Sequence, residues 1–204
     1  MQGKFIVIEG GDGAGKDANI DLLKAALSDA SILWVKDPGG TEIGGQLREI
    51  LQHGERVAKE TELFLFLASR AQLVQEKILP ALRSGIHVIS NRFDLSTFAY
   101  QIHARGRESL YESLKAMSEI ARGEANPDLV LLLDVAPGEG LARGEKRGEK
   151  KTRIEAEDIA FHEKVRAGYL RYVTNYPHGI IDANRPLPEV YADVERAVKD
   201  ALAK

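Results

Sequence analysis

A glycine-rich segment between an apolar run and a helical pattern constrains the fold of this chain more than any other feature. The apolar run FIVIEG (5–10) leads directly into GDGAGK, and Gly10, Gly15 and Lys16 fit the G-x-x-x-x-G-K part of a phosphate-binding loop. Apolar residues then recur at helical spacing. A strand, a loop of this kind and a helix in succession are typical of parallel α/β folds that bind nucleotides.

The composition of the loop explains why it can bind an anion. Its glycines let the backbone N–H groups turn inward around a phosphate, and the helix that follows adds the positive end of its dipole. Lys16 can reach the β- and γ-phosphates of a nucleotide. The candidate ATP-binding residues are Gly10, Gly11, Asp12, Gly13, Ala14, Gly15, Lys16 and Asp17.

Asp17 departs from the motif, which has serine or threonine at this position to hold Mg²⁺. A carboxylate there repels a polyphosphate, yet aspartate is also a good oxygen ligand for Mg²⁺. The sequence therefore leaves open whether the loop is impaired or holds its metal in another way.

Short apolar runs alternate with helical patterns along the rest of the chain. The runs cover 5–10, 32–36, 86–90, 128–135 and 179–182, and their β-branched content is typical of buried parallel strands. Helices are expected over 60–79, where Pro80 can kink or end the helix, and over 108–122, 155–176 and 187–204. This alternation predicts an open, doubly wound parallel sheet with helices on both faces.

Charge and composition exclude several classes of function. The formal net charge is −3, which does not favour a nucleic-acid-binding surface, and the chain has no cysteine for disulfides, thiolate metal sites or thiol nucleophiles. No signal peptide and no run long enough to span a membrane is evident. We therefore expect a soluble cytoplasmic protein that binds neither nucleic acid nor membrane.

Beyond the loop, four further segments resemble those of bacterial thymidylate kinases, in the same order. They are DPGGTEIGGQLREIL (37–51), LFLASRAQL (65–73), NRFDLSTFAYQ (91–101) and RGEKRGEKKTRIEAEDIAFHEKVRAGYL (143–170). The resemblance implies a P-loop NTPase-type five-stranded sheet of order 2-3-1-4-5, in one nucleoside monophosphate kinase domain over 1–204 with a lid at about 141–154. It also implies transfer of the γ-phosphoryl of ATP to dTMP with Mg²⁺, and a homodimer with helix 60–79 as a candidate interface.

The same resemblance assigns roles around the acceptor nucleotide. Phe66 would stack on thymine, Arg70 would donate to its O4, and Gln101 would bond its N3 edge near Thr97. The remaining expected substrate contacts are Tyr100 beside the ribose 2′ position, Asp12 at the 3′-hydroxyl, Arg48 on the acceptor phosphate, Arg92 between the two phosphates, and Asp37.

Phosphoryl transfer needs positioned cations more than covalent catalysis. Lys16 and Arg92 supply two of them. The loop has no arginine at its variable positions, so the resemblance places the transition-state arginine in the lid, where Arg143, Arg147 and Arg153 are the candidates.

The chain also departs from the family pattern. Asn91 replaces the acidic residue before Arg92, Asp37 replaces a glutamate, and Ala18 lacks a hydroxyl. The carboxylate lost at Asn91 is regained at Asp17, so these two residues are the candidate metal ligands. Two alternatives remain open: a catalytically weakened nucleotide-binding homologue, and a kinase for another deoxynucleoside monophosphate.

Overall fold

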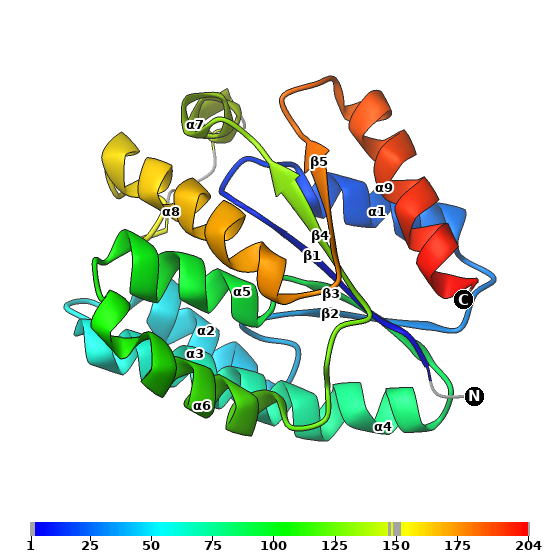
Figure 1. Ribbon diagram of the computed structural model, residues 1–204, viewed down its shortest axis with the longest axis horizontal. Helices are drawn as coiled ribbons and strands as arrows, with labels where there is room; N and C mark the ends of the chain where they lie inside the picture. The colour runs from blue at the N-terminus through cyan, green and yellow to red at the C-terminus, as the bar shows by residue number, and fades with distance from the viewer. Residues whose placement is uncertain (1–2, 147, 149–151, 204) are drawn as a thin grey trace.

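An open five-stranded sheet lies between two layers of helices (Figure 1). The structure, a computed structural model, describes residues 3–146, 148 and 152–203. Neighbouring strands are parallel in the order β2-β3-β1-β4-β5, which confirms the predicted fold and strand order. The strands are β1 (Phe5–Gly10), β2 (Ile32–Lys36), β3 (His87–Asn91), β4 (Leu129–Asp134) and β5 (His178–Asp182).

Helices cover most of the predicted ranges, although the helix expected from 155 begins at Ile159 and the helix expected to kink or end at Pro80 continues past it. They are α1 (Lys16–Ala26), α2 (Glu42–His53), α3 (Lys59–Leu73), α4 (Leu79–Arg83), α5 (Asp94–Thr97), α6 (Tyr111–Arg122), α7 (Pro137–Lys146), α8 (Ile159–Tyr172) and α9 (Leu187–Leu202). Shorter π or 3₁₀ segments are η1 (Val74–Ile78), η2 (Phe98–Ala104), η3 (Glu108–Leu110) and η4 (Val173–Asn175). The helix does not end at Pro80, because a π-helical turn precedes it and proline is tolerated in the first turn of α4.

The two faces of the sheet bury alternate residues of the same strands. Phe5 and Val7 of β1 belong to a large cluster with α3, α4, α6 and α8, whereas Ile6 and Ile8 pack with α1 and α9. All four side chains are fully buried. The period of two along a strand gives this division, and burial of each such side chain stabilises the fold by roughly 1.5–3 kcal/mol.

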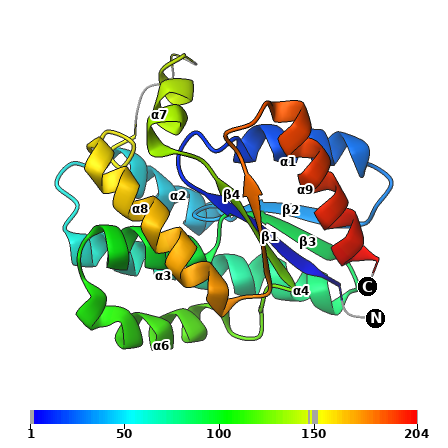
Figure 2. The same ribbon diagram turned by 45° about the horizontal axis from the view of Figure 1, so that its top comes forward.

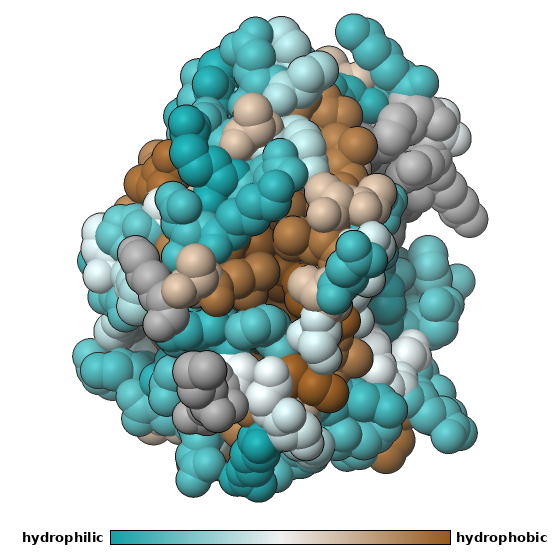
Figure 3. Space-filling model, turned by 90° about the vertical axis from the view of Figure 1, so that its right-hand side faces the viewer, coloured by the Kyte–Doolittle hydropathy of each residue, from teal (hydrophilic) through white to brown (hydrophobic). Residues whose placement is uncertain are grey.

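The carboxyl ends of the strands lie at the edge from which α7 projects (Figure 2). Here β1 leads into the glycine loop and β3 ends at Asn91, so both segments meet at one place. Parallel sheets of this class bind ligands at this edge. Both chain termini lie at the other end of the sheet; this end faces the viewer in Figure 3, where apolar side chains gather among polar ones.

Candidate active site

Lys16 is held inside the glycine loop. Its Nζ donates to the carbonyl oxygens of Gly10 at 2.9 Å and Gly11 at 2.7 Å. Gly15 has a φ of 83° at the start of α1, a conformation that glycine adopts without strain. Burial lowers the pKa of Lys16 to about 7. The ammonium group thus lies at the centre of the loop, where a phosphate gives it an anionic partner.

The loop also packs tightly against the first turn of α7, just before the predicted lid segment. A Cβ atom at Gly13 would lie 2.0 Å from the carbonyl oxygen of Gly140, and one at Gly140 would lie 2.2 Å from that of Asp12. Gly13 has a φ of 74° as well. The two backbones can meet only because both positions are glycine, so the loop and α7 are in direct contact.

Asp17 and Asn91, the candidate metal ligands, are in contact. The Asp17 Oδ1 accepts from Asn91 Nδ2 at 2.7 Å and from Lys36 Nζ at 3.0 Å. The Asp17 side chain is 72% exposed, and the Oδ1 of Asn91 is buried without a partner among the described residues. These oxygens fit Mg²⁺, which binds to one or two carboxylates together with phosphates and water. No group of three or more acidic, histidine or cysteine side chains in the described part of the chain forms a metal cage.

Arg92 joins the loop to the acceptor side of the site. Its guanidinium donates to the carbonyl oxygen of Gly10 at 3.0 Å, to Tyr169 Oη at 2.7 Å and to Asp12 Oδ1 at 2.8 Å. Burial alone would raise the pKa of Asp12, but the charges of Arg92 and Lys16 outweigh it and hold this pKa below its usual value. Tyr100 Oη also donates to Asp12, at 3.0 Å.

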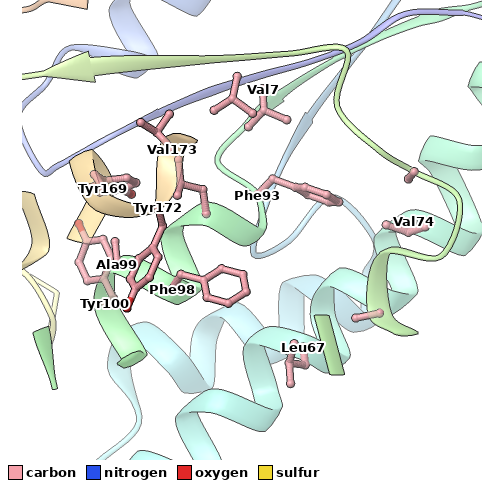
Figure 4. Close-up of a cluster of buried hydrophobic side chains, with 14 of the residues drawn as sticks. Val7, Leu67, Val74, Phe93, Phe98, Ala99, Tyr100, Tyr169, Tyr172 and Val173 are labelled. Carbon is pink, nitrogen blue, oxygen red and sulfur yellow. The ribbon is translucent and has the colours of Figure 1, made fainter. Parts of the chain in front are cut away.

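A buried carboxylate beneath Arg92 supports its unusual backbone. Arg92 has a φ of 70°, a left-handed conformation that costs a residue with a side chain roughly 1–3 kcal/mol. The fully buried Glu9 accepts from the backbone N–H groups of Phe93 at 2.8 Å and Ser96 at 3.2 Å, which fixes the turn that follows Arg92. Tyr169 Oη donates to the same carboxylate at 3.2 Å and lies edge-on to Tyr100 (Figure 4).

Arg70 lies fully buried at the other end of the site. Its Nε donates to Asp37 Oδ2 at 2.7 Å, and its Nη2 donates to the carbonyl oxygen of Phe93 at 3.1 Å and to Thr97 Oγ1 at 2.9 Å. Its Nη1 is buried without a hydrogen-bond partner among the described residues. The pair with Asp37 therefore orients the guanidinium and leaves one donor for a ligand.

One cavity of about 430 Å³ brings most of these predicted residues together. Its volume suits a nucleotide-sized ligand. Arg48, whose Nη1 donates to the carbonyl oxygen of Pro38 at 3.0 Å, also lies on its wall. The predicted site residues that line the cavity are Asp12, Gly13, Gly15, Lys16, Asp17, Asp37, Arg48, Phe66, Arg70, Asn91, Arg92, Thr97, Tyr100 and Gln101.

Two of the predicted lid arginines, Arg143 and Arg153, bond to residues outside the loop. Arg143 donates to the carbonyl oxygens of Ala183 at 2.8 Å and Asn184 at 3.3 Å, beside the end of β5. Arg153 contacts Glu62 on the acceptor side. Arg147 lies outside the described residues. The catalytic role of all three therefore stays a prediction.

The structure adds residues that the sequence analysis did not single out. Glu9, Glu62 and Tyr169 are all buried and all bond to residues that line the cavity. Two of them carry a signal in the sequence: Glu9 is the one acid in an apolar strand, and Glu62 precedes Phe66 by four residues, one helical turn.

Comparisons with known proteins agree with this geometry. The family model described as thymidylate kinase matches residues 8–194. The thymidylate kinase of Caldanaerobacter subterraneus subsp. tengcongensis is 42% identical over 99% of this chain and 98% of its own length. Those of Alteromonas mediterranea and Magnetococcus marinus are 43% and 40% identical, over 95% and 98% of this chain and 88% and 97% of their own lengths. The chain therefore belongs to the thymidylate kinase family.

Proposed function

We propose that the protein catalyses ATP-dependent phosphorylation of dTMP to dTDP. The observation that carries this proposal is the position of Arg92, which bonds both to the phosphate loop at Gly10 and to Asp12 beside Tyr100. One cation can therefore contact the donor and the acceptor phosphate in a shared cavity. Membership of the thymidylate kinase family supports the same reaction.

In this reaction an oxygen of the dTMP phosphate attacks the γ-phosphorus of ATP, and the bond to the β–γ bridging oxygen breaks. Negative charge spreads over the transferring group, so positioned cations lower the barrier. Lys16 lies where it can contact the β- and γ-phosphates, and Arg92 lies between the donor and acceptor sides. In this proposal Arg48 would hold the acceptor phosphate, and the lid arginines would move to close over the reaction.

Mg²⁺ bound with ATP supplies further charge neutralisation at the β- and γ-phosphates. Asp17 and the amide oxygen of Asn91 are the residues that would hold it. Their hydrogen bond places the carboxylate and the amide side by side at the start of α1. Lys36 neutralises Asp17 from its other side.

The acceptor base lies against Phe66, with Arg70 and Gln101 at its edge. In the part of the chain that the structure describes, Arg70 has one buried donor without a partner, which suits the O4 carbonyl of thymine. Tyr100 and Asp12, which are hydrogen-bonded to each other, are placed for the deoxyribose. This arrangement argues against a kinase for a base with a different edge.

A catalytically weakened homologue is the second candidate. Asp17 already accepts hydrogen bonds from Lys36 and Asn91, so the metal position has protein partners without a metal. A coupled assay with ATP, Mg²⁺ and each of dTMP, dCMP, dGMP and dAMP separates the candidates. We expect turnover with dTMP well above the others. Absence of turnover with all four, in protein that still binds ATP, would support the weakened homologue.

The homodimer and the cytoplasmic location are also proposed on family grounds. The helices α2 and α3 pack together and expose Ile43, Ile50 and Phe64 by 51%, 47% and 57%. Such apolar residues on one pair of helices are suited to a second copy of the chain. Sedimentation equilibrium tests this: we expect a dimer, and Phe64→Glu should weaken it. In the described residues, none of the helices combines the length and apolarity required to cross a bilayer.

A further inference from the structure

Glu62 is a buried carboxylate that the reaction described above does not use. It lies in the first half of α3 and is 1% exposed. Its Oε1 accepts a hydrogen bond from Gln101 Nε2 at 3.1 Å. Its Oε2 bonds to Arg153, and Arg105 Nη2 lies 3.7 Å from its Oε1. The two arginines compensate the charge of this buried carboxylate.

The chemistry of this contact fixes which way the Gln101 amide points. An ionised carboxylate only accepts hydrogen bonds, whereas an amide has a donor end and an acceptor end. Gln101 must therefore present its NH₂ group to Glu62, and its Oε1 is left for the cavity that it lines. None of the described residues donates a hydrogen bond to that oxygen. At the edge of the base, Gln101 thus offers an acceptor and no donor.

Arg70 completes a two-point pattern beside it. Its other nitrogens are engaged by Asp37, Thr97 and the carbonyl oxygen of Phe93, and among the described residues only Nη1 has no partner. At the proposed edge of the base, Arg70 therefore presents a donor with fixed orientation and Gln101 an acceptor with fixed orientation. A pyrimidine with a 4-oxo group and an N3–H matches this pair, while a 4-amino pyrimidine with a bare N3 opposes it at both points.

We propose that Glu62 is a positioning residue that sets the base specificity of the acceptor site by locking the orientation of the Gln101 amide. This inference rests on the proposed function and identifies the contact by which the site discriminates dTMP from dCMP. A site built to hydrogen-bond a substrate group rejects an analogue that lacks it by large factors. Without the hydrogen bond to Glu62, the Gln101 amide can flip and present its NH₂ group to the unprotonated N3 of cytosine.

The test is the ratio of kcat/KM for dTMP to that for dCMP in the Glu62→Gln variant. The new amide can accept or donate, so both orientations of Gln101 become possible. We expect the ratio to fall at least about tenfold, through a lower value for dTMP and a higher one for dCMP. The matched control is Glu60→Gln, because Glu60 lies on the same helix, is 65% exposed and pairs with Arg107. Its ratio should equal that of the wild type.

A purely structural role for Glu62 predicts a different result. Glu62→Gln would then lower the melting temperature and the activity toward both nucleotides equally, and an unchanged ratio would overturn the inference. A Gln101→Ala background sharpens the test, because Glu62→Gln should not change the ratio further there. A further change in the ratio in that background would also contradict the proposal.

A measurement on the wild type keeps the proposal testable if Glu62→Gln does not fold. In the dTMP complex, nuclear Overhauser contacts of the Gln101 side-chain NH₂ protons should run to Glu62 and not to the thymine imino proton. Contacts to the imino proton would overturn the inference. A wild type that binds dTMP but does not phosphorylate it would instead count against the proposed function, and the orientation of Gln101 could still be read from this complex.

Discussion

Two aspartates beside the cavity, Asp37 and Asp17, each pair with a cation but in opposite surroundings. The Asp37 side chain is 1% exposed and bonds to Arg70, which is equally buried. The Asp17 side chain is 72% exposed, and its partner Lys36 is 41% exposed. The first pair is part of the core and the second lies at the surface of the site. We therefore expect the buried Arg70–Asp37 pair to keep its geometry when a ligand binds. The exposed Lys36–Asp17 pair can exchange its partners for a nucleotide and its metal ion.

The energies of the two pairs follow from this difference. Removal of one partner from a buried ion pair leaves an uncompensated charge and costs about 3–5 kcal/mol. An exposed pair is worth about 0–1 kcal/mol because water and salt screen it. This contrast explains why a carboxylate at position 17 can depart from the motif without loss of the fold.

Loss of Arg92 should have the largest effect, because this residue connects the donor and acceptor sides. We expect Arg92→Ala to lower kcat by about 10³-fold, the typical cost of one cation aimed at a transferring phosphoryl group. The coupled assay at saturating ATP and dTMP measures it. Arg83→Ala is the matched control, since Arg83 is 62% exposed and pairs with Glu124. A loss of less than tenfold would show that Arg92 does not contact the transferring group.

Unfolding experiments directly test the difference in strength between the ion pairs of the two aspartates. Asp37→Ala should lower the free energy of unfolding by about 3 kcal/mol, because Arg70 is left buried and charged. Asp17→Ala should lower it by less than about 1 kcal/mol. Urea denaturation of both variants beside the wild type gives the two values. Equal losses would mean that the difference in exposure does not set the strength of the pairs.

Contact between the loop and α7 predicts a smaller effect on ATP binding. A side chain at Gly13 meets the carbonyl oxygen of Gly140 and also requires a strained backbone. Gly13→Ala should therefore raise the Kd for Mg-ATP about tenfold, or ~1.4 kcal/mol. Titration calorimetry measures this. Gly138→Ala is the control, because a Cβ there meets nothing within 4 Å. The contact has no role in ATP binding if both variants bind alike.

The sequence predicted the fold because local patterns decide it. The apolar runs and the helical patterns between them led to the parallel α/β fold, while the resemblance supplied the strand order. The helix expected from 155 begins at Ile159, and at Pro80 a π-turn accommodates the proline. The candidate site came mainly from the resemblance: Phe66, Arg70 and Gln101 were expected at one pocket and line one cavity.

Other features of the site depend on contacts between residues far apart in the chain. Glu62 and Gln101 are 39 positions apart, and Arg92 and Tyr169 are 77 apart, so no local pattern relates them. The same holds for Lys36, which the sequence analysis did not single out. Its pairing with Asp17 depends on the approach of the end of β2 to the start of α1.

We propose that positions 17 and 91 have exchanged their acidic residue, so that Asp17 takes over the metal-binding role beside ATP. Asn91 Nδ2 lies 2.7 Å from Asp17 Oδ1, so the two positions are close enough to couple. Asp17→Ser removes the carboxylate proposed to hold the metal, while Asn91→Asp places two carboxylates in contact. Both single changes should lower activity, and the double change should restore the usual family arrangement.

The most direct test is the initial rate of dTDP formation by four proteins: the wild type, Asp17→Ser, Asn91→Asp and the double variant, each with saturating dTMP and Mg-ATP. We predict an active wild type, at least a tenfold loss in each single variant, and a double variant that equals or exceeds the wild type. Losses that multiply in the double variant would show that the two residues do not share a metal. A wild type without measurable activity beside an active double variant would instead identify a weakened kinase.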